Sequence, residues 1–296
     1  MSASPFSEKL DRIPTTEHTL SMGKSNIHYW EYGDPTQPVD LVLIHGFRGD
    51  HHGLEPIVAE LGPHIHAIIP DLPGFGSSDP LYPHADIDAF SRWLTEFWSE
   101  LKVSSNTVIL GHSFGSIIVS AALAGGFPAD RAILINPIAA NALSGPRALL
   151  TKLAVFYYAL AARLPSRLGY ALLKNKSIVR VMSNTMAKTE DKYLRKWIHQ
   201  QHDLYFSVFS SRNAVLEAFT TSVSHDVSEF APQISQEVLL IAAEKDDITA
   251  VDRQHHLASI LSISHLEVIP DVGHLVHYEA PSHAAALISQ FLGSAR

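Results

Sequence analysis

Residues 106–126 constrain the fold of this chain more than any other stretch. The segment begins at 107–110 with β-branched and aliphatic residues typical of a buried strand. It passes through the sequence GHSFG and continues as an apolar run of helical spacing that ends at Gly125-Gly126. A strand that turns so sharply into a helix leaves no room for side chains at positions 111 and 115. The pattern therefore predicts a tight turn that raises the hydroxyl of Ser113 above a sheet.

Composition and charge exclude several classes of protein. The chain has 296 residues, 46% of them hydrophobic, which is typical of a soluble globular protein with a sizeable core. A net charge of −8 argues against a nucleic-acid partner. With no cysteine, disulfides, thiolate catalysis and cysteine-ligated zinc are excluded.

No stretch of the sequence indicates stable membrane insertion. The N-terminus lacks the apolar region of a secretory signal. The longest apolar stretch, 148–162, is interrupted by Lys152 and is too short to span a bilayer. We therefore expect a cytoplasmic protein, either a monomer or a homodimer, whose partner is a small molecule.

Short aliphatic runs recur along the chain and alternate with helical segments. A hairpin is expected over 19–32, and residues 86–101 repeat apolar side chains at helical period. Further strands are expected at 40–44, 66–70, 107–110, 132–136, 238–242 and 265–269. The continuous apolar run at 40–44 is typical of a strand buried on both faces of a parallel sheet. This alternation predicts an α/β fold with a doubly wound, mostly parallel sheet.

The interval between the strands at 132–136 and 238–242 is far longer than a crossover requires. Residues 141–226 read as helical, with one amphipathic run at 149–160 and a capped helix start at 189–191. We expect a core made of 1–140 and 227–296, with 141–226 inserted as a helical cap. The cap would lie over the carboxyl edge of the sheet, where open α/β sheets bind ligands. The alternative is a second helical layer with no role at the site.

A serine nucleophile needs an imidazole within hydrogen-bond reach and a carboxylate to hold that imidazole. Downstream of Ser113, Asp246 and Asp247 follow one expected strand and His274 follows the last one. Since parallel strands end at the same edge of a sheet, these side chains are expected to meet there. The predicted triad is Ser113, an aspartate at 246 or 247, and His274.

These motifs resemble the α/β-hydrolase superfamily, in its capped branch of small bacterial esterases. The resemblance covers residues 39–291 and rests on HGF at 45–47, the loop 71–78, GHSFG at 111–115, EKD at 244–246, GH at 273–274, and Glu279 with Pro281. Family members commonly carry Gly-x-x-Asp at the acid. Ala243 replaces that glycine here but leaves Asp246 in register, which favours Asp246 over Asp247. The resemblance also implies an oxyanion hole made of the backbone N–H groups of Phe47 and Phe114.

Eighteen histidines raise the question of a metal. The pairs His51-His52 and His255-His256, and His199 with His202, lack both an HExxH motif and a carboxylate-rich cluster, and we expect them on the solvated surface. The loop at 74–76 lacks the third glycine of a dinucleotide fingerprint. Neither a metal nor a cofactor is therefore expected.

The expected reaction is hydrolysis of a carboxylic ester with a small to medium apolar acyl group, through an acyl-enzyme. A serine nucleophile argues against the epoxide hydrolases and haloalkane dehalogenases of this fold, which carry aspartate there. The alternatives are a thioesterase, a perhydrolase, a carbon–carbon bond hydrolase, or a ligand receptor without catalysis. An acyl group with a charge would require a clamp, for which Arg180, Lys188 and Arg195 are the candidates. The aromatic residues at 156–158 and Trp197 are expected to pack within the cap, or one of them to line the pocket.

Overall fold

A computed structural model describes residues 4–101, 103–140 and 148–293. Their strands form one eight-stranded sheet in the order β1-β2-β4-β3-β5-β6-β7-β8. The strands are β1 (Thr15–Met22), β2 (Ser25–Tyr32), β3 (Leu41–Ile44), β4 (Ala67–Pro70), β5 (Val108–His112), β6 (Arg131–Ile135), β7 (Glu237–Ala243) and β8 (Ile263–Ile269). β1 and β2 pair antiparallel, as do β2 and β4, and the other pairs are parallel. The prediction of a mostly parallel sheet is confirmed.

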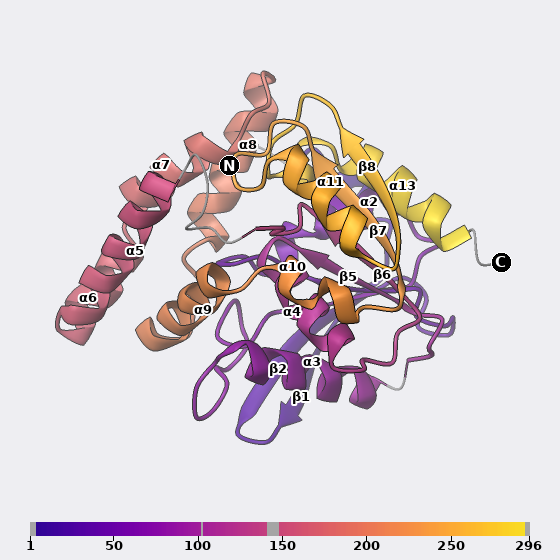
Figure 1. The fold of residues 1–296 in the computed structure, drawn as a ribbon, viewed down its shortest axis with the longest axis horizontal. Helices are drawn as coiled ribbons and strands as arrows, with labels where there is room; N and C mark the ends of the chain where they lie inside the picture. Colours follow the sequence, from indigo (N-terminus) through magenta and orange to yellow (C-terminus); the bar gives the residue numbers. More distant parts are fainter. Residues whose placement is uncertain (1–3, 102, 141–147, 294–296) are drawn as a thin grey trace.

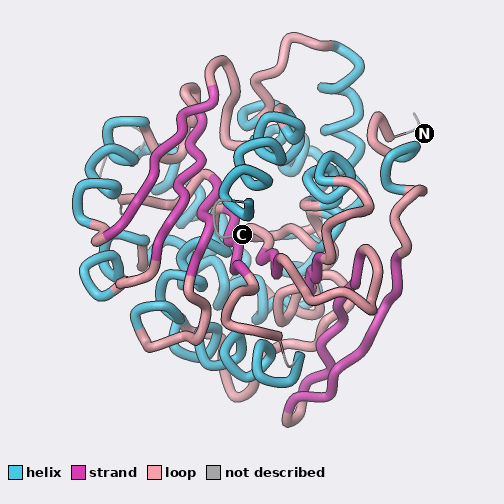
Figure 2. Tube along the Cα trace, turned by 90° about the vertical axis from the view of Figure 1, so that its right-hand side faces the viewer, coloured by secondary structure: helices cyan, strands magenta, loops and turns pink. Residues whose placement is uncertain are grey.

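Helices cover both faces of this sheet, as Figures 1 and 2 show. One face carries α3 (Ile87–Leu101), α4 (Phe114–Ala124), α10 (Val227–Phe230) and α11 (Val251–Ile260), and the other carries α2 (Glu55–Leu61), α12 (Val276–Glu279) and α13 (Pro281–Gly293). A short helix, α1 (Ser7–Leu10), precedes β1. Ile109 of β5 packs into one core, whereas Val108 and Leu110 pack into the other. Because both faces are buried, the central strands consist of continuous apolar runs.

Between β6 and α10, the described residues form five helices. They are α5 (Ala148–Arg163), α6 (Ser166–Leu173), α7 (Lys176–Met186), α8 (Lys192–Tyr205) and α9 (Arg212–Ser224). α5 packs against α6 and α9, and α7 packs against α8. In Figure 1, α5 and α6 lie at the far left, away from the strands. Helices therefore make up most of 148–224, with non-helical segments at 187–191 and 206–211, and residues 141–147 lie outside the described part of the chain.

The start of α8 differs slightly from its prediction. Asp191 is the N-cap, and its carboxylate accepts hydrogen bonds from the N–H groups of Tyr193 and Leu194. Thr189 and Glu190 therefore precede the helix.

Among the described residues, no helix combines the length and apolar character needed to cross a lipid bilayer.

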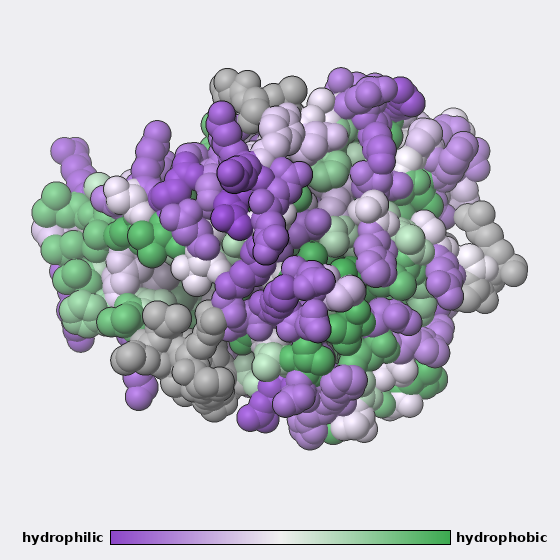
Figure 3. Space-filling model, turned by 90° about the horizontal axis from the view of Figure 1, so that it is seen from above, coloured by the Kyte–Doolittle hydropathy of each residue, from purple (hydrophilic) through white to green (hydrophobic). Residues whose placement is uncertain are grey.

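Three of the apolar side chains that define the run at 149–160 do not belong to the buried face of α5. Leu153, Phe156 and Leu160 are exposed, whereas Tyr158 and Ala161 are buried. α5 is apolar around most of its circumference, so its periodicity could not select the face that packs on α6 and α9. In Figure 3 the exposed apolar atoms appear as green groups at the left end of the molecule.

Candidate active site

Ser113 lies in the sharp turn between β5 and α4. Its backbone has φ +53° and ψ −117°, a conformation that side-chain-bearing residues rarely adopt. A Cβ on Gly111 would lie 2.6 Å from the carbonyl oxygen of Gly115, and a Cβ on Gly115 would lie 2.3 Å from that of Ile44. Both distances are too short for any side chain, so the predicted need for glycine at these two positions is confirmed.

Replacing Gly115 by alanine should destabilise the fold strongly. The new methyl group would meet backbone atoms of β3, which cannot move aside, so we expect a loss of about 3 kcal/mol in the free energy of unfolding. Gly293→Ala is the matched control, since a Cβ there meets no atom within 4 Å. Denaturant unfolding of both variants measures the difference. Equal stabilities would contradict the tight turn.

Three polar side chains form a hydrogen-bonded chain at the carboxyl edge of the sheet. His274 Nε2 lies 2.8 Å from Ser113 Oγ, and His274 Nδ1 lies 2.8 Å from Asp246 Oδ2. Asp246 follows β7 and His274 follows β8, as the sequence predicts. With a neutral imidazole, Nδ1–H donates to the carboxylate and Nε2 accepts from the serine hydroxyl. Asp246 and His274 are both buried.

The carboxylate of Asp246 is held by further donors. The Asn136 side-chain amide donates to it at 2.9 Å, and the Ile248 backbone N–H donates at 2.7 Å. Burial acts to raise the pKa of Asp246, but its contacts with His274 and Asn136 outweigh burial, and the pKa lies below the usual value. Asp246 therefore stays ionised beside His274.

Asn136 is a site residue that the sequence analysis missed. It follows β6 directly and has φ +45°. The signal that singled out Asp246 and His274, a polar side chain just after a parallel strand, is also present at this position. The sequence predicted Asn136 as the last residue of a strand over 132–136, whereas β6 ends at Ile135, and no motif marks the asparagine.

The neighbouring aspartate lies in a different environment. Asp247 forms an ion pair with Lys188, which belongs to the segment between α7 and α8. Of the two carboxylates left open by the sequence, the structure brings Asp246 to His274.

The loop after β3 lies against the serine turn. A Cβ on Gly46 would be 3.2 Å from Ser113 Cβ, and the rings of Phe47 and Phe114 meet edge to face with centroids 6.3 Å apart. Within the described chain, the backbone N–H groups of Phe47 and Phe114 have no hydrogen-bond acceptor. One of these N–H groups belongs to the residue after Ser113, and the other belongs to the loop that lies against the serine turn.

The side chain of His45 holds the loop after β3 through two hydrogen bonds. Its Nδ1–H donates to the Gly46 carbonyl at 2.9 Å, and its Nε2 accepts from the Leu72 N–H at 2.8 Å. Burial lowers the pKa of His45, which keeps the ring neutral and able to serve as donor and acceptor at once.

A cavity of about 170 Å³ adjoins Ser113 and His274. This volume is close to the roughly 150 Å³ that accommodates one benzene molecule in an apolar protein cavity. α7 contributes Met182 and Met186 to its wall, α8 contributes His202, and Phe206 follows α8 directly. The other apolar wall residues are Phe47, Leu54, Ile248, Leu275 and Tyr278.

Comparison with known proteins identifies the family of the chain. A family model described as "Alpha/beta hydrolase family" matches residues 41–286. The chain belongs to the alpha/beta hydrolase family. Two similar relatives are Lipase 1 of Psychrobacter immobilis and Lipase 3 of Moraxella sp. (strain TA144). Lipase 1 is 28% identical to this chain, and the match covers 83% of this chain and 74% of the lipase. Lipase 3 is 27% identical, and the match covers 90% of this chain and 81% of the lipase.

Solved structures of other hydrolases share the fold. An esterase from Exiguobacterium antarcticum superposes with a TM-score of 0.76 at 18% identity, covering 94% of this chain and all (100%) of that one. A carboxylesterase from Bacillus subtilis superposes with a TM-score of 0.72 at 16% identity, covering 98% of this chain and 96% of the carboxylesterase. At such identities the likeness concerns the fold alone.

The three cations considered as a clamp lie away from the cavity of this hydrolase. Arg180 pairs with Asp203, Lys188 pairs with Asp247, and Arg195 donates to the Thr189 carbonyl. Within the described ranges, no lysine or arginine lines the cavity. Of the aromatic residues considered, Phe156 is exposed, whereas Tyr158 stacks on Phe219 and the Trp197 ring contacts Tyr278.

The prediction that the paired histidines lie on the surface is wrong for His51 and His202, which are both buried. Trp30 stacks on His51 with ring centroids 3.3 Å apart, and Ser183 Oγ lies 2.7 Å from His202 Nδ1. The residues that contact these two histidines lie far from them in the sequence, so a local sequence pattern does not reveal that the histidines are buried.

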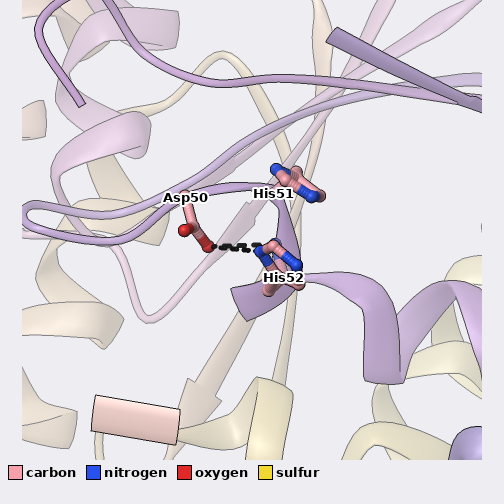
Figure 4. A group of neighbouring side chains, drawn as sticks. All are labelled: Asp50, His51 and His52. Atoms are coloured by element: carbon pink, nitrogen blue, oxygen red, sulfur yellow. Dashed lines mark hydrogen bonds and ion pairs between the residues drawn. The ribbon is translucent and has the colours of Figure 1, made fainter. Parts of the chain in front are cut away.

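The ligand atoms of Asp50, His51 and His52 lie within 4.8 Å of one another (Figure 4). Both Nδ1 atoms are already engaged, that of His51 by Asp71 at 2.9 Å and that of His52 by Asp50 at 3.2 Å. This arrangement accounts for the cluster as two histidine–carboxylate pairs. That the hydrolase needs no metal stays a prediction.

Proposed function

We propose that the protein is a serine hydrolase that cleaves a carboxylic ester through an acyl-enzyme, with Ser113, His274 and Asp246 as its triad. The observation that carries the proposal is the hydrogen-bonded chain of these three side chains beside a small apolar cavity. Relatives named as lipases support ester hydrolysis as the reaction. Within this proposal, 141–226 is a cap whose helices α7 and α8 wall the acyl pocket.

The first half of the reaction forms the acyl-enzyme. Ser113 Oγ attacks the ester carbonyl carbon while His274 Nε2 takes the hydroxyl proton. The carbonyl π electrons move to oxygen, and the N–H groups of Phe47 and Phe114 stabilise this oxyanion. When the carbonyl re-forms, the bond to the alcohol oxygen breaks and His274 returns the proton to the departing alkoxide.

The second half repeats these steps with water. His274 removes a proton from water as the water oxygen attacks the acyl carbon. The bond to Ser113 Oγ then breaks, Ser113 regains its proton from His274, and the carboxylic acid leaves. Asp246 stays ionised throughout and stabilises the imidazolium that forms twice in the cycle.

The size of the cavity sets the expected preference among p-nitrophenyl esters. Each methylene that fits should add about 0.8 kcal/mol of binding, part of it expressed in the transition state. We expect kcat/KM to rise from acetate to a short or medium chain and then fall as the about 170 Å³ cavity fills. A steady rise to the longest chains would contradict a closed pocket. A preference for dicarboxylate esters would indicate a charged clamp outside the described residues.

A cap residue offers a sharper version of this test. Met182 lines the cavity, whereas its neighbour Val181 on α7 is exposed. Met182→Ala should shift the preferred acyl chain to a longer one, while the control Val181→Ala should leave the profile unchanged. An unchanged profile in Met182→Ala would contradict the cap as a wall of the acyl pocket.

A further inference from the structure

Arg48 occupies the turn that carries the Phe47 N–H. The Gly49 N–H donates to the Gly46 carbonyl at 3.1 Å, which makes Arg48 the third residue of a four-residue turn. Its φ is +63°, in the left-handed region that favours glycine or asparagine at this position. An arginine is therefore held here in a strained backbone conformation, and its side chain should explain why.

The side chain of Arg48 is fully buried and binds the helices inserted after β6. Nη2 donates to the Leu173 carbonyl at 2.7 Å, and Nε donates to the Phe206 carbonyl at 2.9 Å. Nη1 donates to the Tyr158 hydroxyl at 3.1 Å, and Nη2 also donates to Ser207 Oγ at 3.3 Å. These acceptors lie on α5, at the end of α6 and just after α8. One guanidinium thus joins three parts of the insertion.

All four acceptors are neutral. The guanidinium also lies against the rings of Phe206 and Phe209, with Cζ 5.4 and 5.5 Å from their centroids. Among the described residues, the hydrogen-bond partners of the guanidinium include no carboxylate. A buried cation without a carboxylate partner is unfavourable for stability alone. A role beyond stability is the simplest reason for this residue at this place.

We propose that Arg48 is a positioning residue that fixes the oxyanion turn to the cap, so that the Phe47 N–H is aimed correctly only while the cap is docked. This inference rests on the proposed function, since it presumes that Phe47 donates to the oxyanion. The rigid guanidinium fork is suited to the role because it spans several acceptors at fixed angles. The strained turn and the cap would then hold each other in place.

The test compares Arg48→Met and Arg48→Lys with Arg131→Met. Arg131 is the matched control because it also donates to a backbone carbonyl and lies over a phenylalanine ring, both of Phe291. We expect both Arg48 variants to lower kcat for a short p-nitrophenyl ester by about 100-fold, the loss typical of one oxyanion donor. KM should change by less than about threefold, because Arg48 itself does not line the acyl pocket. Arg131→Met should leave kcat unchanged.

Two further variants keep the inference open to contradiction. In Arg48→Gly the new residue readily adopts the positive φ of the turn, but it has no guanidinium to bind the inserted helices. Its kcat should therefore fall as much as that of Arg48→Met. Tyr158→Phe removes a single acceptor, and it should lower kcat several-fold in the wild-type background but not when added to Arg48→Met. Wild-type kcat in the folded Arg48 variants, with only a lower Tm, would make Arg48 a structural brace and overturn the proposal. In a folded Tyr158→Phe protein, an unchanged kcat would overturn it equally.

Failure of the proposed function would be recognised separately. Treating the wild-type protein with a serine-reactive phosphonate labels Ser113 if the triad operates, whatever Arg48 does. Labelled wild type together with fully active Arg48 variants would overturn the inference alone. Unlabelled and inactive wild type would overturn both.

Discussion

Replacing Ser113 by alanine should lower kcat for p-nitrophenyl ester hydrolysis by roughly 10⁴- to 10⁶-fold. The hydroxyl that lies 2.8 Å from His274 Nε2 is the nucleophile in our account, and no other group in the triad can form the acyl-enzyme. The residual rate would come from the oxyanion donors and substrate binding. Because only one oxygen is removed from a partly exposed site, the Tm should stay within about 2 °C of wild type.

A matched control lies on the following helix. Ser120 is buried in α4, and among the described residues its hydroxyl has no hydrogen-bond partner. Ser120→Ala should therefore retain wild-type activity. If Ser113→Ala turned over ester at the wild-type rate after rigorous purification, the serine mechanism would be wrong.

The pair of aspartates gives the second large effect. Asp246→Asn should lower kcat by roughly 10⁴-fold, because an amide can donate to His274 and so favour the wrong tautomer, and because it cannot stabilise the imidazolium. Asp247→Asn is its adjacent control. That carboxylate pairs with Lys188, and its loss should change kcat by less than about tenfold.

Steady-state kinetics of the two asparagine variants, each checked for folding by circular dichroism, measures this difference. A greater loss in Asp247→Asn than in Asp246→Asn would reverse our assignment of the acid.

The sequence predicted the positions of Ser113, Asp246 and His274 because one physical rule covers all three. Each residue follows a parallel strand, and parallel strands end at a common edge. β5 and β7 are buried, whereas β8 is the edge strand and is only partly buried. The same rule applies to Asn136, but the sequence analysis placed this residue at the end of the strand 132–136, and no motif accompanies it. The mostly parallel sheet was predictable for a related reason, since only strands buried on both faces consist of continuous apolar runs.

Features that depend on remote partners were not predictable. Arg48 binds Tyr158 and Ser207, which lie 110 and 159 residues away in the sequence. The burial of His51 depends on Trp30 and Asp71, and neither forms a local pattern with it. The sequence could not predict which face of α5 is packed, because the apolar residues of this helix lie on most of its sides. In each case the tertiary contact, not the local sequence, decides the outcome.

The most direct test of the account is the structure of the protein after reaction with a phosphonate that carries a short alkyl group. We predict a covalent bond from phosphorus to Ser113 Oγ, with the phosphonyl oxygen within hydrogen-bond distance of the N–H groups of Phe47 and Phe114. The alkyl group should lie in the cavity beside Met182 and Met186. A phosphonate bound to another residue, or a phosphonyl oxygen turned away from both N–H groups, would contradict the proposed active site.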